Sequence, residues 1–122
     1  MGDLSKNFSL QEFNQKNAPL KSEEIKVDPK LVERLQILRD MVKKPIYITS
    51  GYRTSEYNKK VGGAIKSQHM EGKAADITVK GMTAKELELL AKKVGFTYTQ
   101  TYFNKPHLHV DVRDNSGAVK GY

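Results

Sequence analysis

Apolar residues recur at helical spacing in two parts of the sequence, and each part carries signals for a helix start and end. The first begins at Asp28-Pro29, where a capping residue precedes proline at the first helical position, and it ends before Pro45. The second begins at Thr83, which opens a capping box, and stops at Gly95. The sequence therefore predicts two amphipathic helices, whose buried residues are Leu31, Leu35, Leu38 and Val42 in the first and Leu87, Leu90, Ala91 and Val94 in the second.

Shorter segments predict the rest of the fold. Capping residues indicate short helices after Ser9 and after Thr54 or Ser55. Strand patterns occupy residues 45–50, 74–79, 96–103 and 107–112. We therefore expect an α+β fold, in which helices pack on one side of a small, mostly antiparallel sheet that ends in a hairpin.

Composition limits the class of protein. The chain has 122 residues, of which 38% are hydrophobic and 29% charged, and this favours one soluble globular domain spanning residues 1–122. It has no apolar run of the ~18 residues that a membrane span needs, and its first residues lack the apolar stretch of a signal peptide. We therefore expect synthesis in the cytoplasm and no membrane partner.

The charge and the missing cysteines narrow the choice further. A net charge of +7 favours polyanionic partners such as nucleic acid or an anionic cell wall. The lysines are scattered, without the aromatic-interleaved basic stripe of RNA-binding proteins, so we expect no nucleic-acid partner. Because the chain has no cysteine, histidine, aspartate and glutamate are the side chains left to hold a metal.

The last predicted strand, HLHVDV, has one apolar and one polar face. Side chains alternate along a strand, so Leu108, Val110 and Val112 point to the core. The opposite face carries His107, His109, Asp111 and Arg113. Two of the three histidines of the chain therefore share this face, which makes an incidental polar surface less probable than a site.

The stretch SQHMEGKAAD holds the third histidine. His69 and Asp76 lie seven positions apart, and a bend at Gly72 followed by a strand from Ala74 can bring the carboxylate back beside the imidazole. With His109 they offer two imidazoles and one carboxylate, which are ligands that zinc accepts. By spacing alone, a pair of this kind is more often part of a surface loop.

The combination of motifs is more specific than either pair. The pattern S-x-H-x-x-G-x-A-x-D at residues 67–76, SGYR at residues 50–53 and HLHVDVR at residues 107–113 resemble the zinc D-alanyl-D-alanine carboxypeptidases and their short phage-type relatives. These share a fold with hedgehog signalling domains and lysostaphin-type peptidases. The resemblance implies a bound Zn²⁺ with His69, Asp76 and His109 as its ligands.

The resemblance also implies two catalytic residues. Arg53 matches an arginine that steadies substrate or the developing oxyanion, and His107 matches a histidine that assists at the metal-bound water. The sequence departs from the family where several members place a glutamate or aspartate three residues before the last zinc ligand, because Pro106 stands there. The general base is then His107, a carboxylate from elsewhere such as Glu71, or none.

Neighbouring residues have two interpretations each. Asp111 either orients a histidine as a hydrogen-bond acceptor or forms an ordinary solvated or salt-bridged carboxylate. The tyrosines Tyr98 and Tyr102 are assigned to packing, with the edge of a cleft as the alternative.

The function that follows is hydrolysis of a peptide bond in a bacterial peptidoglycan stem peptide by a zinc metallopeptidase. We expect a monomer that reaches the cell wall after release, as phage lysis proteins do. The bond that is cut stays open between a carboxypeptidase and an endopeptidase cleavage. The alternative is a non-catalytic zinc-containing binding module of the same fold, which the proline at residue 106 favours.

Overall fold

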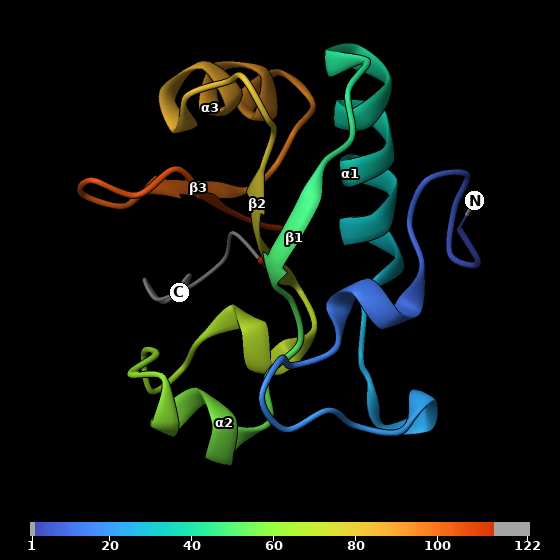
Figure 1. The fold of residues 1–122 in the computed structure, drawn as a ribbon, viewed down its shortest axis with the longest axis vertical. Coiled ribbons are helices and arrows are strands. Elements are labelled where there is room, and N and C mark those ends of the chain that lie inside the picture. The colour runs from blue at the N-terminus through green and yellow to red at the C-terminus, as the bar shows by residue number, and fades with distance from the viewer. Residues whose placement is uncertain (1, 114–122) are drawn as a thin grey trace.

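The computed structural model describes residues 2–113 and contains one antiparallel sheet with the strand order β1-β2-β4-β3 (Figure 1). Its strands are β1 (Tyr47–Ser50), β2 (Ala74–Thr78), β3 (Tyr98–Thr101) and β4 (Leu108–Asp111). The predicted α+β class and antiparallel sheet are therefore confirmed. Residue 1 and residues 114–122, which the predicted domain includes, lie outside the described residues.

The helices begin where the capping residues predict. The structure has α1 (Pro29–Val42), α2 (Ser55–Lys60) and α3 (Ala84–Lys93), with short 3-10 helices at Leu10–Phe13 (η1), Ser22–Glu24 (η2) and Gln68–Glu71 (η3). The Asp28 carboxylate accepts a hydrogen bond from the Lys30 amide at 2.8 Å, and the Thr83 hydroxyl accepts one from the Glu86 amide at 3.1 Å. None of the helices in residues 2–113 is long and apolar enough to cross a membrane.

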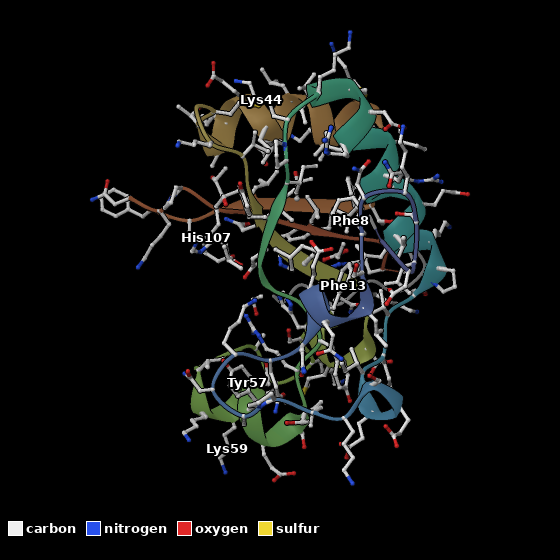
Figure 2. All side chains as sticks on the ribbon, turned by 45° about the vertical axis from the view of Figure 1, so that its right-hand side comes forward. Phe8, Phe13, Lys44, Tyr57, Lys59 and His107 are labelled. Atoms are coloured by element: carbon white, nitrogen blue, oxygen red, sulfur yellow. The ribbon has the colours of Figure 1, made fainter. Side chains whose placement is uncertain are left out.

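One face of the sheet forms the hydrophobic core. Helices α1 and α3 pack on this face, and Phe8 and Phe13 from the N-terminal segment join them (Figure 2). The largest fully buried apolar side chains are Phe8, Phe13, Leu31, Leu35, Leu38, Ile77, Leu87, Leu108 and Val110. The predicted helical stripes and the apolar face of the last strand therefore meet in one cluster, and their burial supplies the main stabilisation of the fold.

The opposite face of the sheet is polar. Asp76 of β2 and His109 of β4 are direct register partners, and His109 also pairs with Gln100 of β3. Partners across antiparallel strands point to the same face, so these side chains gather at one place. Helix α2 and η3 lie at one end of the sheet, beside this face (Figure 1).

Gly72 makes the turn that leads from η3 into β2. Its φ of 71° lies in the left-handed region, and a Cβ atom there would stand 2.6 Å from the carbonyl oxygen of Lys26. Glycine is the residue that satisfies both the backbone angle and the close approach. The bend expected from the sequence therefore places His69, before the turn, next to Asp76, after it.

Candidate metal centre

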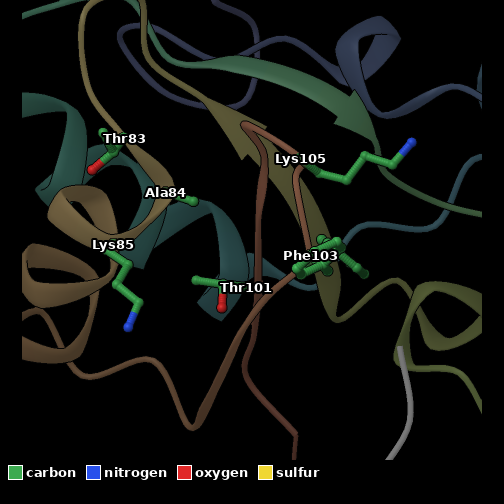
Figure 3. A pocket seen from close by; sticks show the side chains of 7 residues that line it. Thr83, Ala84, Lys85, Thr101, Phe103 and Lys105 are labelled. Carbon is green, nitrogen blue, oxygen red and sulfur yellow. The ribbon is translucent and has the colours of Figure 1, made fainter.

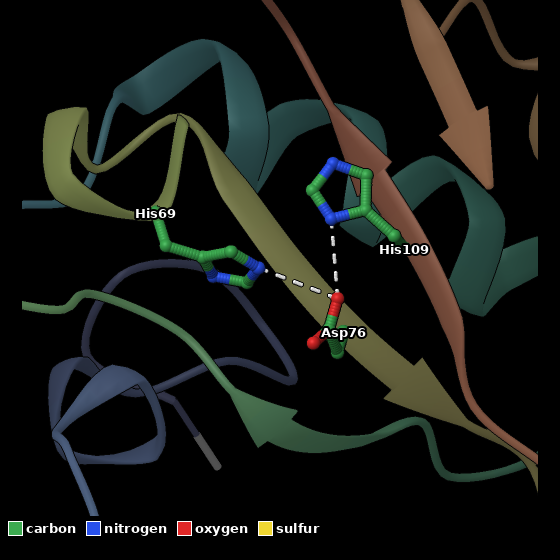
Figure 4. A group of neighbouring side chains, drawn as sticks. All are labelled: His69, Asp76 and His109. Atoms are coloured by element: carbon green, nitrogen blue, oxygen red, sulfur yellow. Dashed lines mark hydrogen bonds and ion pairs between the residues drawn. The ribbon is translucent and has the colours of Figure 1, made fainter. Parts of the chain in front are cut away.

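Three side chains from separate elements converge on the polar face of the sheet (Figure 4). His69 comes from η3, Asp76 from β2 and His109 from β4, and their nearest ligand atoms all lie within 4.8 Å of one another. Asp76 Oδ1 is 3.3 Å from His69 Nε2 and 3.2 Å from His109 Nδ1. The structure thus brings together the three residues that the motifs single out.

The ring of His69 is oriented by the backbone. Its Nδ1 lies 2.7 Å from the carbonyl oxygen of Gly51, and because a carbonyl can only accept, Nδ1 carries the proton. Ser67 caps η3 by accepting a hydrogen bond from the His69 amide at 3.2 Å. In the neutral ring, Nε2 is then left with a lone pair that faces Asp76.

The ring of His109 is oriented by a carboxylate. Its Nε2 donates to Asp111 Oδ2 at 2.7 Å, and Arg113 holds the same carboxylate through Nη2 at 2.6 Å and Nε at 2.9 Å. The guanidinium of Arg113 lies over the Tyr98 ring, 4.1 Å from its centre. Asp111 therefore fits both interpretations from the sequence, since it orients a histidine and is salt-bridged.

Burial and hydrogen bonding shift the pKa values of these groups in opposite directions. Burial lowers the pKa of His69, although its contact with Asp76 opposes this effect. Burial alone would also lower the pKa of His109, but its hydrogen bonds to Asp111 and Asp76 raise it. Burial alone would raise the pKa of Asp76, but the contacts with His109 and His69 hold it well below its ordinary value.

This donor set fits a metal ion. Two imidazole nitrogens and one carboxylate oxygen meet at a buried point, and zinc binds these atom types. Within residues 2–113, His69 Nε2 is one of the few buried side-chain nitrogens without a hydrogen-bond partner. A lone pair that faces a carboxylate oxygen is unfavourable, and either a proton or a cation between the two atoms removes the repulsion.

Two further side chains reach the same carboxylate. Arg53 Nη2 lies 3.6 Å from Asp76 Oδ2, and the Tyr102 hydroxyl donates to Asp76 Oδ1 at 3.0 Å. Arg53 was predicted here, whereas Tyr102 was assigned to packing. Alternation along residues 96–103 does place Tyr102 on the face of Gln100, which pairs with His109, so this signal could have found it.

The predicted catalytic histidine lies outside the cluster. The half-buried ring of His107 contacts the Tyr102 ring, with 4.8 Å between centres. Glu71 and Pro106 are both exposed. Tyr102 also helps to line a pocket of about 530 Å³ between the start of α3 and the β3–β4 hairpin, whose end carries the exposed Phe103 (Figure 3).

A relative with a similar sequence and a family model agree with the motifs. A zinc D-Ala-D-Ala carboxypeptidase from Streptomyces albus G is 40% identical over 65 residues, which make up 52% of this chain and 26% of the carboxypeptidase. The chain thus spans about a quarter of that relative's length. The solved L-Ala D-Glu endopeptidase ChiX of Serratia marcescens superposes with a TM-score of 0.49 and 16% identity, over 69% of this chain and 80% of the endopeptidase. The family model for peptidase M15 matches residues 6–111, and the chain therefore belongs to the peptidase M15 family.

Proposed function

We propose that this chain is a zinc metallopeptidase that hydrolyses a peptide bond in the stem peptides of bacterial peptidoglycan. The observation that carries the proposal is the convergence of His69 Nε2, Asp76 Oδ1 and His109 Nδ1 at one buried point. The substrate class rests on the similarity to the zinc D-Ala-D-Ala carboxypeptidase. The net charge of +7 suits an anionic wall, which we propose the chain reaches as a monomer after release.

The protein side chains have separate tasks in this proposal. His69, Asp76 and His109 would hold the zinc ion, which would serve as a Lewis acid toward water and a peptide carbonyl. The hydrogen bond from His109 Nε2 to Asp111 keeps Nδ1 directed at the site.

Arg53 is proposed to stabilise negative charge on the reacting carbonyl oxygen. Its guanidinium stands beside Asp76, and the Arg53 side chain is 10% exposed. A cation that is held in place before the reaction, in surroundings poor in water, stabilises a developing oxyanion strongly. The Tyr102 hydroxyl donates to Asp76 Oδ1 and so helps to hold this carboxylate in place.

His107 is the proposed proton carrier, because no carboxylate stands three residues before His109. The His107 ring packs on the ring of Tyr102, and the Tyr102 hydroxyl reaches Asp76. His107 therefore lies beside the proposed metal site but is not one of its ligands. We expect His107→Ala to lower kcat by about 100-fold, as for loss of a general acid or base. Zinc affinity, measured by competition with a chromophoric chelator, should stay at the wild-type value. Loss of zinc instead would show that His107 is a ligand.

A panel of synthetic stem peptides tests the proposed function. The zinc-loaded protein is incubated with each peptide, and the products are identified by mass spectrometry. The candidate bonds are the terminal D-Ala-D-Ala bond, the bond between L-Ala and the D-acidic residue, and a cross-link. Cleavage at one of them supports the proposal. One bound zinc without cleavage at any bond would leave the non-catalytic binding module as the function.

A further inference from the structure

Helix α2 buries one residue, and that residue is polar. Asn58 is 3% exposed, while the other residues of this six-residue helix lie at or near the surface. The Asn58 side chain makes two hydrogen bonds. Its Oδ1 accepts from Arg53 Nη1 at 3.0 Å, and its Nδ2 donates to the carbonyl oxygen of Ala64 at 2.8 Å. An asparagine with both ends bonded connects the loop after α2 to Arg53.

The guanidinium of Arg53 is held at each of its three nitrogens. Nε donates to Ser50 Oγ at 3.1 Å, Nη1 donates to Asn58, and Nη2 faces Asp76 Oδ2 at 3.6 Å. Because the N–H bonds of a guanidinium form a rigid planar fork, partners at all three nitrogens restrain its rotation as well as its position. Asn58 therefore holds the guanidinium at Nη1, while Asp76 faces it at Nη2.

Gly63 provides the space for this contact. A Cβ atom at residue 63 would lie 2.0 Å from Asn58 Oδ1 and 2.7 Å from Arg53 Nη1, so any side chain here would push the pair apart. The Gly63 amide also donates to the Asn58 carbonyl at 2.8 Å. The neighbouring Gly62 differs, because its φ of 75° favours glycine but nothing lies within 4 Å of a Cβ there.

We propose that Asn58 and Gly63 are positioning residues that hold the Arg53 guanidinium beside Asp76. This inference rests on the proposed function, in which Arg53 stabilises the reacting oxygen. A donor that must meet a transient negative charge works best when its direction is set in advance. In Asn58→Ala, the buried Nη1 of Arg53 loses its hydrogen-bond acceptor. In Gly63→Ala, the added methyl group displaces that acceptor, Asn58 Oδ1.

The first measurement follows the guanidinium itself and does not depend on activity. In nitrogen-15 spectra of the zinc-loaded full chain, the Nη1 protons of Arg53 should give resolved signals, because the Asn58 contact restrains rotation of that group. In Asn58→Ala and Gly63→Ala, faster rotation of this group should merge the signals into an average. In Gly62→Ala the signals should stay resolved, although the backbone is strained there. Resolved signals in both test variants would overturn the proposal. Thermal melting shows whether either test variant fails to fold. If one does, the signals of the other test variant decide whether the proposal holds.

The second measurement tests whether Asn58 acts through Arg53. We expect Asn58→Ala and Gly63→Ala to lower kcat/KM by about 10-fold to 100-fold, with unchanged zinc affinity. In an Arg53→Ala background, Asn58→Ala should have no further effect, since the residue it positions is gone. An equal loss in both backgrounds would contradict the proposal. If wild type cleaves no peptide, the proposed function fails, and the guanidinium signals alone decide whether Asn58 positions Arg53.

Discussion

His109→Ala should strongly weaken zinc binding and, with it, peptide hydrolysis. His109 is fully buried, its Nδ1 faces Asp76 Oδ1, and its Nε2 is held by Asp111. Its removal leaves two of the three proposed ligands, and we expect the zinc affinity to fall on the order of 100-fold or more. Without bound metal the water is no longer activated, so the hydrolysis rate should fall to background.

The matched control for this substitution is His107→Ala, two residues earlier on the same chain segment. That variant also loses one imidazole but should keep its zinc, because His107 contacts the Tyr102 ring and stands outside the cluster. Zinc affinity of both variants is measured by competition with a chromophoric chelator, and hydrolysis by mass spectrometry. Wild-type zinc affinity in His109→Ala would show that the metal is held elsewhere.

Arg53→Ala should lower the rate of hydrolysis without releasing the zinc ion. We expect kcat/KM to fall by about 100-fold to 1,000-fold, the range typical for loss of one donor to a developing oxyanion. Zinc should stay bound, because the guanidinium contacts Asp76 Oδ2, while the two imidazoles face Oδ1. Arg53→Lys keeps the charge but cannot contact Ser50 and Asn58 at once, so it should recover only part of the activity.

The control for Arg53 is Lys59→Ala, which removes one positive charge from the exposed surface of α2. Its kcat/KM should match that of wild type, because an exposed charge is screened by solvent. Kinetics on a stem peptide and zinc titrations are run on all the variants. Equal activity of Arg53→Ala and wild type would remove Arg53 from the proposed mechanism, and loss of zinc would move it into the metal site.

Local signals predicted much of this architecture. Capping residues such as Asp28 and Thr83 marked the helix starts, because they satisfy backbone amides within one turn and need no tertiary partner. The helix end was less well marked. Helix α1 ends at Val42 with Lys43 in a left-handed conformation, φ 57°, before Pro45 is reached. A lysine there carries no sequence signal for that conformation, which glycine or asparagine more often adopts.

The sequence predicted the proposed metal ligands of the candidate site better than the residues that contact them. His69, Asp76 and His109 form a motif with recognisable spacing, and the structure brings them together. Alternation along residues 96–103 could have found Tyr102, but the contact of Asn58 with Arg53 depends on how a short helix lies in space, which the spacing of residues does not specify. Strand alternation assigned Asp111 to the right face, but it could not show that Arg113 would bond to that carboxylate.

Hydrolysis of a stem peptide in the presence and absence of zinc shows whether the protein is a zinc metallopeptidase. The full chain is stripped of metal with a chelator, divided, and assayed by mass spectrometry before and after one equivalent of zinc is restored. We expect no cleavage without zinc, cleavage at a single peptide bond with it, and no cleavage by His69→Ala or His109→Ala under either condition. Equal cleavage with and without zinc, or none by the wild type with zinc bound, would show that the chain is not a zinc metallopeptidase of stem peptides.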